Sequence, residues 1–154
     1  MFGTERRAMN RPRLTDQPLA GELIAEAYAD WAPQIRNDFV ANSHNGHVGT
    51  RLLSESGRAR VWEIVLAPGE RVSAHRHVLD YFWTAGSSGS SLQHTSDGTT
   101  RAVSYVAGET RHFTFAAGEF LLHDLVNIGD TVLEFITVEF LDSANGPLPL
   151  APRA

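Results

Sequence analysis

Cysteine is absent from this chain of 154 residues. Its absence excludes disulfide bonds, thiolate metal ligands and cysteine nucleophiles together. No stretch of the sequence approaches 18 consecutive apolar residues, so we expect no transmembrane helix. Residues 1–13 contain four arginines, but no apolar run follows them, and the segment therefore does not look like a secretory signal. These absences predict a cytoplasmic protein.

A basic surface is also lacking. The formal net charge is −5, and no basic stripe runs along the sequence, which disfavours nucleic acid as a partner. A phosphate-binding glycine loop, a nucleophilic serine elbow and an acidic metal cluster are missing as well. We therefore expect a small-molecule substrate, with neither nucleic acid nor a membrane as a partner.

The apolar content of 42% and the charged content of 20% are typical of one globular domain. We predict a flexible tail over residues 1–14 and a helical extension over residues 15–45, because apolar residues recur every four positions in the second segment. Pro33 falls within this pattern and predicts a kink or a break into two short helices. The recurring apolar residues are Leu19, Leu23, Ala27, Trp31, Ile35 and Phe39.

After residue 50, short segments rich in Val, Ile, Phe, Tyr and Thr alternate with turn signals such as Pro68-Gly69 and Asp97-Gly98. This spacing is typical of a β-sandwich or barrel. We predict an all-β domain over residues 46–142 and a Pro-rich tail over residues 143–154 that runs over the surface. The segments expected to form strands are residues 58–66, 71–77, 81–84, 101–106, 112–115, 120–122 and 132–140.

His75 and His77 lie in the extended segment that follows the Pro68-Gly69 turn. Successive side chains of a strand point to opposite faces, so the two histidines share one face. Two imidazoles one strand repeat apart can bind one metal ion, since histidine is a common ligand for Zn, Fe, Cu and Ni. The same alternation favours Arg71 over Arg76 as a cavity residue that could hold a substrate carboxylate.

This segment resembles the first motif of the cupins, a family of small jelly-roll barrels with a metal site inside. Gly69, His75, His77 and Gly89 stand at the spacing of that motif. The glutamate that the motif places three or four residues after the second histidine is absent, and Tyr81 stands in that region instead.

A second cupin motif is matched in part. His123 and Asn127 reproduce its His-x3-Asn, but its proline is missing, and Gly118 lies five residues before His123 rather than three. The run RVWEIVLAPGE, the Asp-Tyr after the histidine pair and the closing VEFLDS are similar to small bacterial cupins associated with beta-alanine degradation. The resemblance covers about residues 48–142 and implies a single-domain cupin jelly-roll barrel with an N-terminal helical extension.

The resemblance implies that His75, His77 and His123 meet on one divalent metal ion, because the two motif strands face one another inside a jelly roll. Three histidine ligands leave coordination positions open, as catalytic sites do. We expect a metal-dependent enzyme acting on a small organic metabolite, with iron favoured and a dioxygenase-type reaction as the most specific hypothesis. Zinc, nickel or manganese would support an isomerase, decarboxylase or hydrolase instead. The alternative from another class is a non-catalytic cupin that binds a small ligand, as a sensor or storage module.

Three residues near the histidines are candidates for further roles. Tyr81 shares the inward parity of the pair, and a neutral phenol is a poor ligand, so we expect it to contact substrate or metal-bound water. Asp80 would be a good fourth ligand, but strand alternation points it away. His112 could line the cavity as a catalytic acid or base, or lie at the rim.

The other polar and aromatic residues receive simpler predictions. Three histidines in loop-like stretches are expected to be solvated: His44, His47 and His94. Three aromatic residues are expected in the core or the cavity wall: Trp62, Phe82 and Trp83. Glu134 or Glu139 could support a ligand histidine from behind. We also expect a homodimer, because association can cover an open jelly-roll edge and two-fold dimers are the commonest closed assembly. Residues 19–39 would then pack on their own barrel or on the partner's.

Overall fold

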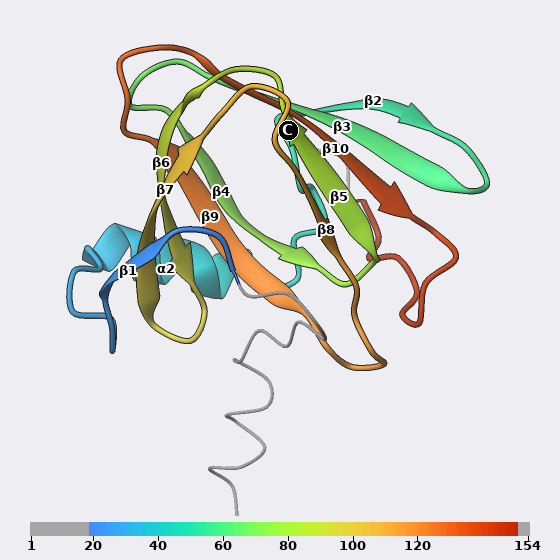
Figure 1. Ribbon diagram of the computed structural model, residues 1–154. Helices are drawn as coiled ribbons and strands as arrows, with labels where there is room; N and C mark the ends of the chain where they lie inside the picture. Colours follow the sequence, from blue (N-terminus) through green and yellow to red (C-terminus); the bar gives the residue numbers. More distant parts are fainter. Residues whose placement is uncertain (1–18, 151–154) are drawn as a thin grey trace, which may run out of the picture.

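The computed structural model describes residues 19–150, which form ten strands and one helix. Two antiparallel five-stranded sheets face each other, and helix α2 (Pro33–Ala41) lies outside the first of them (Figure 1). The first sheet has the order β1 (Glu22–Ala25), β7 (Thr99–Tyr105), β6 (Gly89–Thr95), β9 (Leu121–Asn127) and β4 (Arg71–His77). The second has the order β2 (Arg51–Glu55), β3 (Ala59–Leu66), β10 (Leu133–Phe140), β5 (Tyr81–Ala85) and β8 (Thr110–Phe113).

Strands β3 and β10 show why this sequence forms two layers. Burial alternates residue by residue along both strands, as a period of two requires for a sheet with one face in the core. Their register pairs Leu66 with Leu133 and Ile64 with Phe135, so apolar side chains of neighbouring strands meet on the inner face. These residues belong to the core between the sheets, which consists mainly of Ile64, Leu66, Val72, Val103, Tyr105, Leu125, Leu133 and Phe135.

The Asp97-Gly98 hairpin is confirmed. It joins β6 to β7, and Gly98 adopts φ +90°, a conformation that favours glycine. Its N–H donates a hydrogen bond to the carbonyl oxygen of Thr95 at 2.8 Å. A Cβ atom at Gly98 would stand only 2.9 Å from the ring of Tyr28, so both the turn and the packing require glycine here.

The predicted helical extension over residues 15–45 is wrong in part. Residues 22–25 form strand β1, which pairs with β7, and the helix begins only at Pro33, a residue suited to the first helical position. Ala27 and Tyr28 adopt positive φ angles of 56° and 62°, which end any helical path between the two elements. The later part of the apolar pattern is borne out, because Trp31 and Phe39 are buried together against the outer face of the first sheet.

The all-β fold class is confirmed, but β2 and β6, like β1, have no counterpart among the strands predicted from the sequence. Strand β2 is exposed along its whole length, and β6 carries mostly polar residues, so neither shows the apolar alternation that predicts a strand. Strand β6 nevertheless lies between β7 and β9 inside its sheet. The tail predicted over residues 1–14 lies outside the described residues. Within residues 19–150, no helix is long and apolar enough to cross a membrane.

Candidate metal centre

Strands β4 and β9 pair in a register that places His75 directly opposite His123. His77 follows two residues after His75 and therefore lies on the same face of β4. On its other side β9 pairs with β6, where Thr95 lies opposite His123. His123 therefore comes from a strand inside the sheet, whereas β4 is at the edge. Three imidazoles that are distant in sequence thus reach the inner face of the first sheet at one point.

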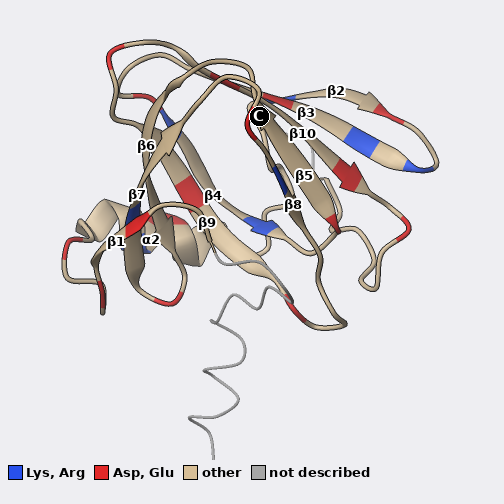
Figure 2. Cartoon of the chain, in the orientation of Figure 1, with Lys and Arg blue, Asp and Glu red and all other residues tan. Residues whose placement is uncertain are grey.

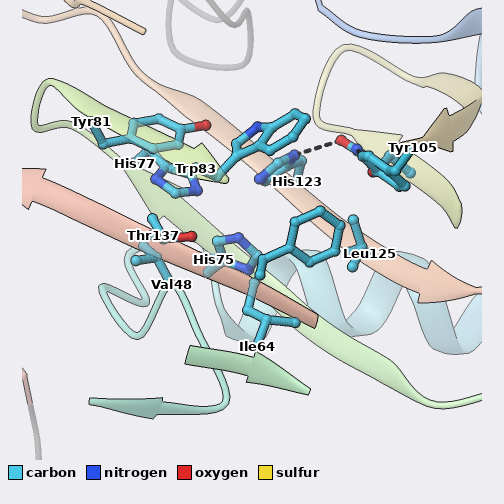
Figure 3. A pocket seen from close by; sticks show the side chains of 12 residues that line it. Val48, Ile64, His75, His77, Tyr81, Trp83, Tyr105, His123, Leu125 and Thr137 are labelled. Atoms are coloured by element: carbon cyan, nitrogen blue, oxygen red, sulfur yellow. Dashed lines mark hydrogen bonds between the residues drawn. The ribbon is translucent and has the colours of Figure 1, made fainter. Parts of the chain in front are cut away.

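The three imidazoles form a compact cluster. One ligand atom of each histidine lies within 4.8 Å of those of the other two, a spacing that would let all three bind one metal ion. Their ring centroids are 4.8–5.2 Å apart. Figure 3 shows the three rings facing the space between the two sheets, with the ring of Tyr81 parallel to that of His77. The His75, His77 and His123 cluster predicted from the sequence is therefore present in the fold.

Hydrogen bonds to Nδ1 determine which ring nitrogen of His75 and of His123 is free to bind a metal ion. The Nδ1 atom of His75 lies 2.8 Å from the carbonyl oxygen of Ser73, and Nδ1 of His123 lies 2.9 Å from Oε1 of Gln93 (dashed line in Figure 3). Both partner oxygens only accept, so Nδ1 carries the proton and Nε2 keeps a free lone pair. Metal-binding histidines are commonly oriented in this way.

His77 has no such partner. Its Nδ1 atom is buried and makes no hydrogen bond within residues 19–150. A buried polar nitrogen without a partner is costly, and a bound metal ion could engage the lone pair of this ring. The donor set thus fits a divalent ion of the kind that imidazole prefers.

Burial keeps all three imidazoles neutral. Desolvation lowers the pKa of His75 to about 4, although the hydrogen bond to Ser73 opposes the shift. Desolvation and the neighbouring histidines hold the pKa values of His77 and His123 well below the ordinary value. Neutral imidazole is the form that binds a metal ion, so the cluster is ready to act as a ligand set at neutral pH.

A small cavity adjoins the cluster. Its free volume is about 40 Å³, enough for an ion and a few water-sized groups. The remaining wall is mainly apolar and aromatic, and no carboxylate, lysine or arginine of the described chain lines it. Besides the histidines, the lining residues are Val48, Ile64, Tyr81, Trp83, Gln93, Tyr105, Leu125, Phe135 and Thr137.

Tyr81 lies in this wall, as predicted. Its ring stacks on His77 with centroids 4.0 Å apart, and burial together with the charge of Glu139 raises its pKa well above the ordinary value. The phenol is therefore protonated at neutral pH. It can donate a hydrogen bond into the cavity, but it is not an anionic ligand.

Arg71 does not line the cavity, and the expectation that it does was wrong. The register of β4 and β9 shifts between Val72 and His75, where β4 has one residue more than its partner. Such a bulge reverses the alternation, so Arg71 lies on the opposite face from His75. There it bonds Asp124 at 2.8 Å and Asp38 at 2.9 Å. Asp124 is the acidic residue of β9, drawn in red in Figure 2.

Asp80 and His112 lie away from the cluster. Asp80 accepts a hydrogen bond from the backbone N–H of Phe115 at 2.9 Å, so its carboxylate supports a loop rather than a metal site. His112 is exposed on the edge strand β8, where its ring lies 5.2 Å from that of Phe82. The expectation that His112 lines the cavity is not met, because Phe113, the next residue, takes the inward position.

Two further expectations need correction. His94 is buried rather than solvated, and its Nδ1 lies 2.8 Å from Oδ2 of Asp124 on the outer side of the first sheet. His47 is partly buried against Trp62, whereas His44 is exposed as expected. Phe82 faces outward beside Phe140 instead of lining the cavity. The polar character of β6 hid the burial of His94, since the sequence of that segment reads as a loop.

Glu139 is the buried acid of the barrel interior, and Glu134 is exposed. The indole N–H of Trp62 donates a hydrogen bond to Glu139 at 2.7 Å. Desolvation raises the pKa of Glu139 to about 7, with Trp62 and Arg60 opposing the shift. Its register position opposite Tyr81 on β5 places it next to the cavity wall. Of the two predicted supporting glutamates, only Glu139 is therefore near the site.

The lowered histidine pKa values predict acid sensitivity of the metal-free protein. Because the folded state resists protonation of His75 down to about pH 4, the unfolded state gains protons first as the pH falls below 6.5. At 1.4 kcal/mol per pKa unit, His75 alone should lower the free energy of unfolding by roughly 2 kcal/mol between pH 7 and pH 5. Chemical denaturation of chelator-treated protein should show this loss. His75→Gln should make the free energy of unfolding less dependent on pH, and His44→Gln should not. An equal pH dependence in the parent protein and both variants would contradict the lowered pKa of His75.

Glu139 should act in the opposite direction. Its carboxylate must be buried in charged form above pH 7, which costs up to about 3 kcal/mol relative to an unfolded chain. Glu139→Gln keeps an acceptor for Trp62 and removes the charge, so it should raise the free energy of unfolding at pH 8.5 and change it little at pH 5. Glu134→Gln, on the same strand but exposed, serves as the control. An equal effect of Glu139→Gln at both pH values would show that its charge is not responsible.

The chain matches no protein-family model and no curated protein. Among solved structures, a cupin domain from Bordetella pertussis Tohama I is similar, with a TM-score of 0.51 and 24% sequence identity over 58% of this chain and 88% of that one. The chain therefore has the cupin fold.

Two further solved structures are similar to this chain at lower TM-scores. A protein with a double-stranded β-helix domain from Klebsiella pneumoniae has a TM-score of 0.48 at 21% identity, over 66% of this chain and 82% of that one. An RmlC-like cupin from Methanocaldococcus jannaschii has a TM-score of 0.46 at 21% identity, over 64% and 79%. The fold and the histidine cluster together define a cupin barrel whose interior could hold a divalent metal ion.

Proposed function

We propose that this chain is a metal-dependent enzyme that acts on a small organic metabolite. The convergence of three buried, neutral imidazoles on the wall of one cavity carries this proposal. His75, His77 and His123 would hold the ion. When bound, the ion would supply Lewis acidity and open coordination positions, and iron would add the capacity to use dioxygen as an oxidant. A dioxygenase-type oxidoreductase with Fe²⁺ is the reaction that we favour, with Zn, Ni or Mn as the other candidate metals.

The cavity wall supports a small and partly apolar substrate. Trp83, Tyr105 and Phe135 line the cavity beside the cluster and make this part of its wall apolar and aromatic. Because no arginine or lysine of the described chain lines the cavity, the protein itself offers no positive group to a substrate carboxylate there. We infer that, within the described part of the chain, a substrate anion in this cavity would be bound by the metal ion rather than by a cationic side chain.

Tyr81 and Gln93 are the polar residues of the cavity wall that would act beside the metal ligands, Tyr81 on the substrate and Gln93 on His123. The neutral phenol of Tyr81 can donate a hydrogen bond to an oxygen of the substrate. Gln93 accepts from His123 and donates to the hydroxyl of Tyr105 at 3.2 Å, so it holds His123 in one orientation. Similarity in RVWEIVLAPGE and VEFLDS favours a relation to the bacterial cupins associated with beta-alanine degradation, which stays a proposal.

Elemental analysis of untagged protein, combined with an oxygen-uptake screen of small 2-oxo and 2-hydroxy acids, tests the proposal. One equivalent of iron and substrate-dependent oxygen consumption are expected. Bound zinc, nickel or manganese without oxygen uptake would favour the isomerase, decarboxylase or hydrolase class. Protein without metal that holds a small ligand tightly would support the sensor or storage alternative and contradict the enzyme.

We also propose a homodimer formed by the outer face of the second sheet. No helix of the described chain covers this face, and Val138 of β10 pairs there with Val61 on one side and Phe82 on the other. Ile136 and Phe140 on the same strand are 40% and 39% exposed, which is high for apolar residues of a central strand. Trp31 and Phe39 pack on their own barrel, so the N-terminal segment is not needed to explain association.

A charge in the middle of this face should break the dimer. Ile136→Lys is expected to halve the mass measured by light scattering, because burial of an unpaired ammonium opposes association. Val106→Lys adds the same charge at an exposed apolar position that follows β7 of the first sheet, and it is the matched control. A monomeric parent protein, or a dimeric Ile136→Lys variant, would contradict this interface.

A further inference from the structure

A second cavity lies on the other side of the first sheet, between helix α2 and the outer faces of β4 and β9. Its volume is about 390 Å³, which falls in the range of small-molecule sites. Tyr28, Trp31, Phe39 and Leu122 form an apolar part of its wall. Arg76 also lines it, and because Arg76 stands between His75 and His77 on β4, this cavity is on the opposite face from the histidine cluster.

Arg76 is a half-buried cation without a counterion. Its Nε donates to the carbonyl oxygen of Ser43 at 2.5 Å, and its guanidinium lies 4.0 Å above the ring of Phe120. Burial lowers its pKa from the ordinary value. No carboxylate of residues 19–150 forms an ion pair with it, whereas Arg60 and Arg71 are each paired. Burial of a charge without an opposite charge nearby is unfavourable. An anion bound beside the guanidinium of Arg76 would therefore be stabilised.

Two other donors at the same cavity have no acceptor among the side chains and backbone of residues 19–150. The guanidinium of Arg36 lies 4.6 Å above the ring of Tyr28, and no ion pair joins it to an acid of the described chain. The indole Nε1 of Trp31 is buried and makes no hydrogen bond within residues 19–150. The chain has 18 acidic residues, but none of those described lines this cavity. Positive charge and unused donors therefore gather beside an apolar wall.

From this arrangement we infer a second ligand site, for an organic acid with an apolar body. The carboxylate would bind between Arg76 and Arg36, since guanidinium groups bind carboxylates through charge-assisted, often bidentate hydrogen bonds. The apolar body would lie against Trp31, Phe39 and Leu122. The site is independent of the metal centre, and it differs from the histidine cavity in having cations in its wall.

Calorimetric titration of the full chain with octanoate tests this site, with octanol as the uncharged match. Octanoate should bind saturably, and octanol should bind at least tenfold more weakly, because it lacks the charge that the arginines recognise. Arg76→Gln should weaken octanoate binding about ten- to hundredfold, the usual effect of losing a charge-assisted hydrogen bond. Arg36→Gln should have a smaller effect, since this side chain is exposed.

Two control variants locate the binding. Arg58→Gln removes the same charge at an exposed position outside this cavity and should bind like the parent chain. His123→Ala removes a cluster histidine and should also retain octanoate binding, which separates this site from the metal centre. The inference is overturned by absence of saturable binding up to millimolar octanoate, by equal binding of octanol, by an unchanged Arg76→Gln variant, or by loss of binding in His123→Ala alone.

Discussion

Replacement of His75, His77 or His123 by alanine should remove most of the bound metal. Each variant leaves two imidazoles, and because loss of even an outer partner of a ligand typically weakens metal binding 10–100-fold, loss of a ligand should cost at least ~100-fold in affinity. Metal content per chain after gel filtration measures the effect. Circular dichroism should show that the barrel is retained.

The control for these variants is His44→Ala, which removes an exposed histidine outside the cluster and should leave the metal content unchanged. His94→Ala would be a poor control, because it would leave the buried carboxylate of Asp124 without one of its partners. A full equivalent of metal in the His75→Ala protein would rule out the proposed ligand set.

Tyr81→Phe should keep the metal and lose most of the turnover. The substitution retains the ring that stacks on His77 and removes only the hydroxyl that faces the cavity. Groups that donate or accept a proton in catalysis typically contribute ~10²–10⁴-fold, so kcat should fall by about that factor. The measurement pairs steady-state kinetics with metal analysis of the same samples.

Tyr28→Phe is the matched control, because its hydroxyl bonds Ser96 outside the histidine cavity. It should leave both kcat and metal content unchanged. If Tyr81→Phe loses its metal instead, the phenol is a ligand. If it retains full turnover, the hydroxyl has no part in the reaction.

The histidine cluster could be predicted from the sequence because its geometry is local and periodic. His75 and His77 are one strand repeat apart, and strand β4 has the bounds expected for it, residues 71–77. His123 came from the resemblance to the second cupin motif, and its pairing with His75 became visible only in the register of β4 and β9. Motif spacing thus located the ligands, whereas the register explains why they meet.

Arg71 shows where alternation stops being a reliable guide. The bulge between Val72 and His75 adds one residue to β4, and everything before it changes face. No residue type in Arg71–His75 marks that extra residue. Partly buried ion pairs with Asp38 and Asp124 hold the arginine outside, and these partners are distant in sequence.

The N-terminal segment shows a second limit. Apolar residues recur every four positions from Leu19 to Phe39, but of these only Trp31 and Phe39 are buried, while Leu23 is 43% exposed in strand β1. The pairing of β1 with β7 decides the structure there, and local periodicity carries no information about such a partner. In strand β6 the opposite happens: a segment without apolar periodicity forms a strand inside the sheet. Its polar residues His94 and Gln93 bond Asp124 and His123, which the sequence pattern does not indicate.

Anomalous diffraction from crystals of the untagged protein, recorded at the absorption edge of the metal found by elemental analysis, tests the central claim most directly. One strong peak is expected inside the barrel, at about 2.0–2.3 Å from a nitrogen of each of His75, His77 and His123. A barrel without a peak after metal is supplied, or a peak bound by other residues, would contradict the account.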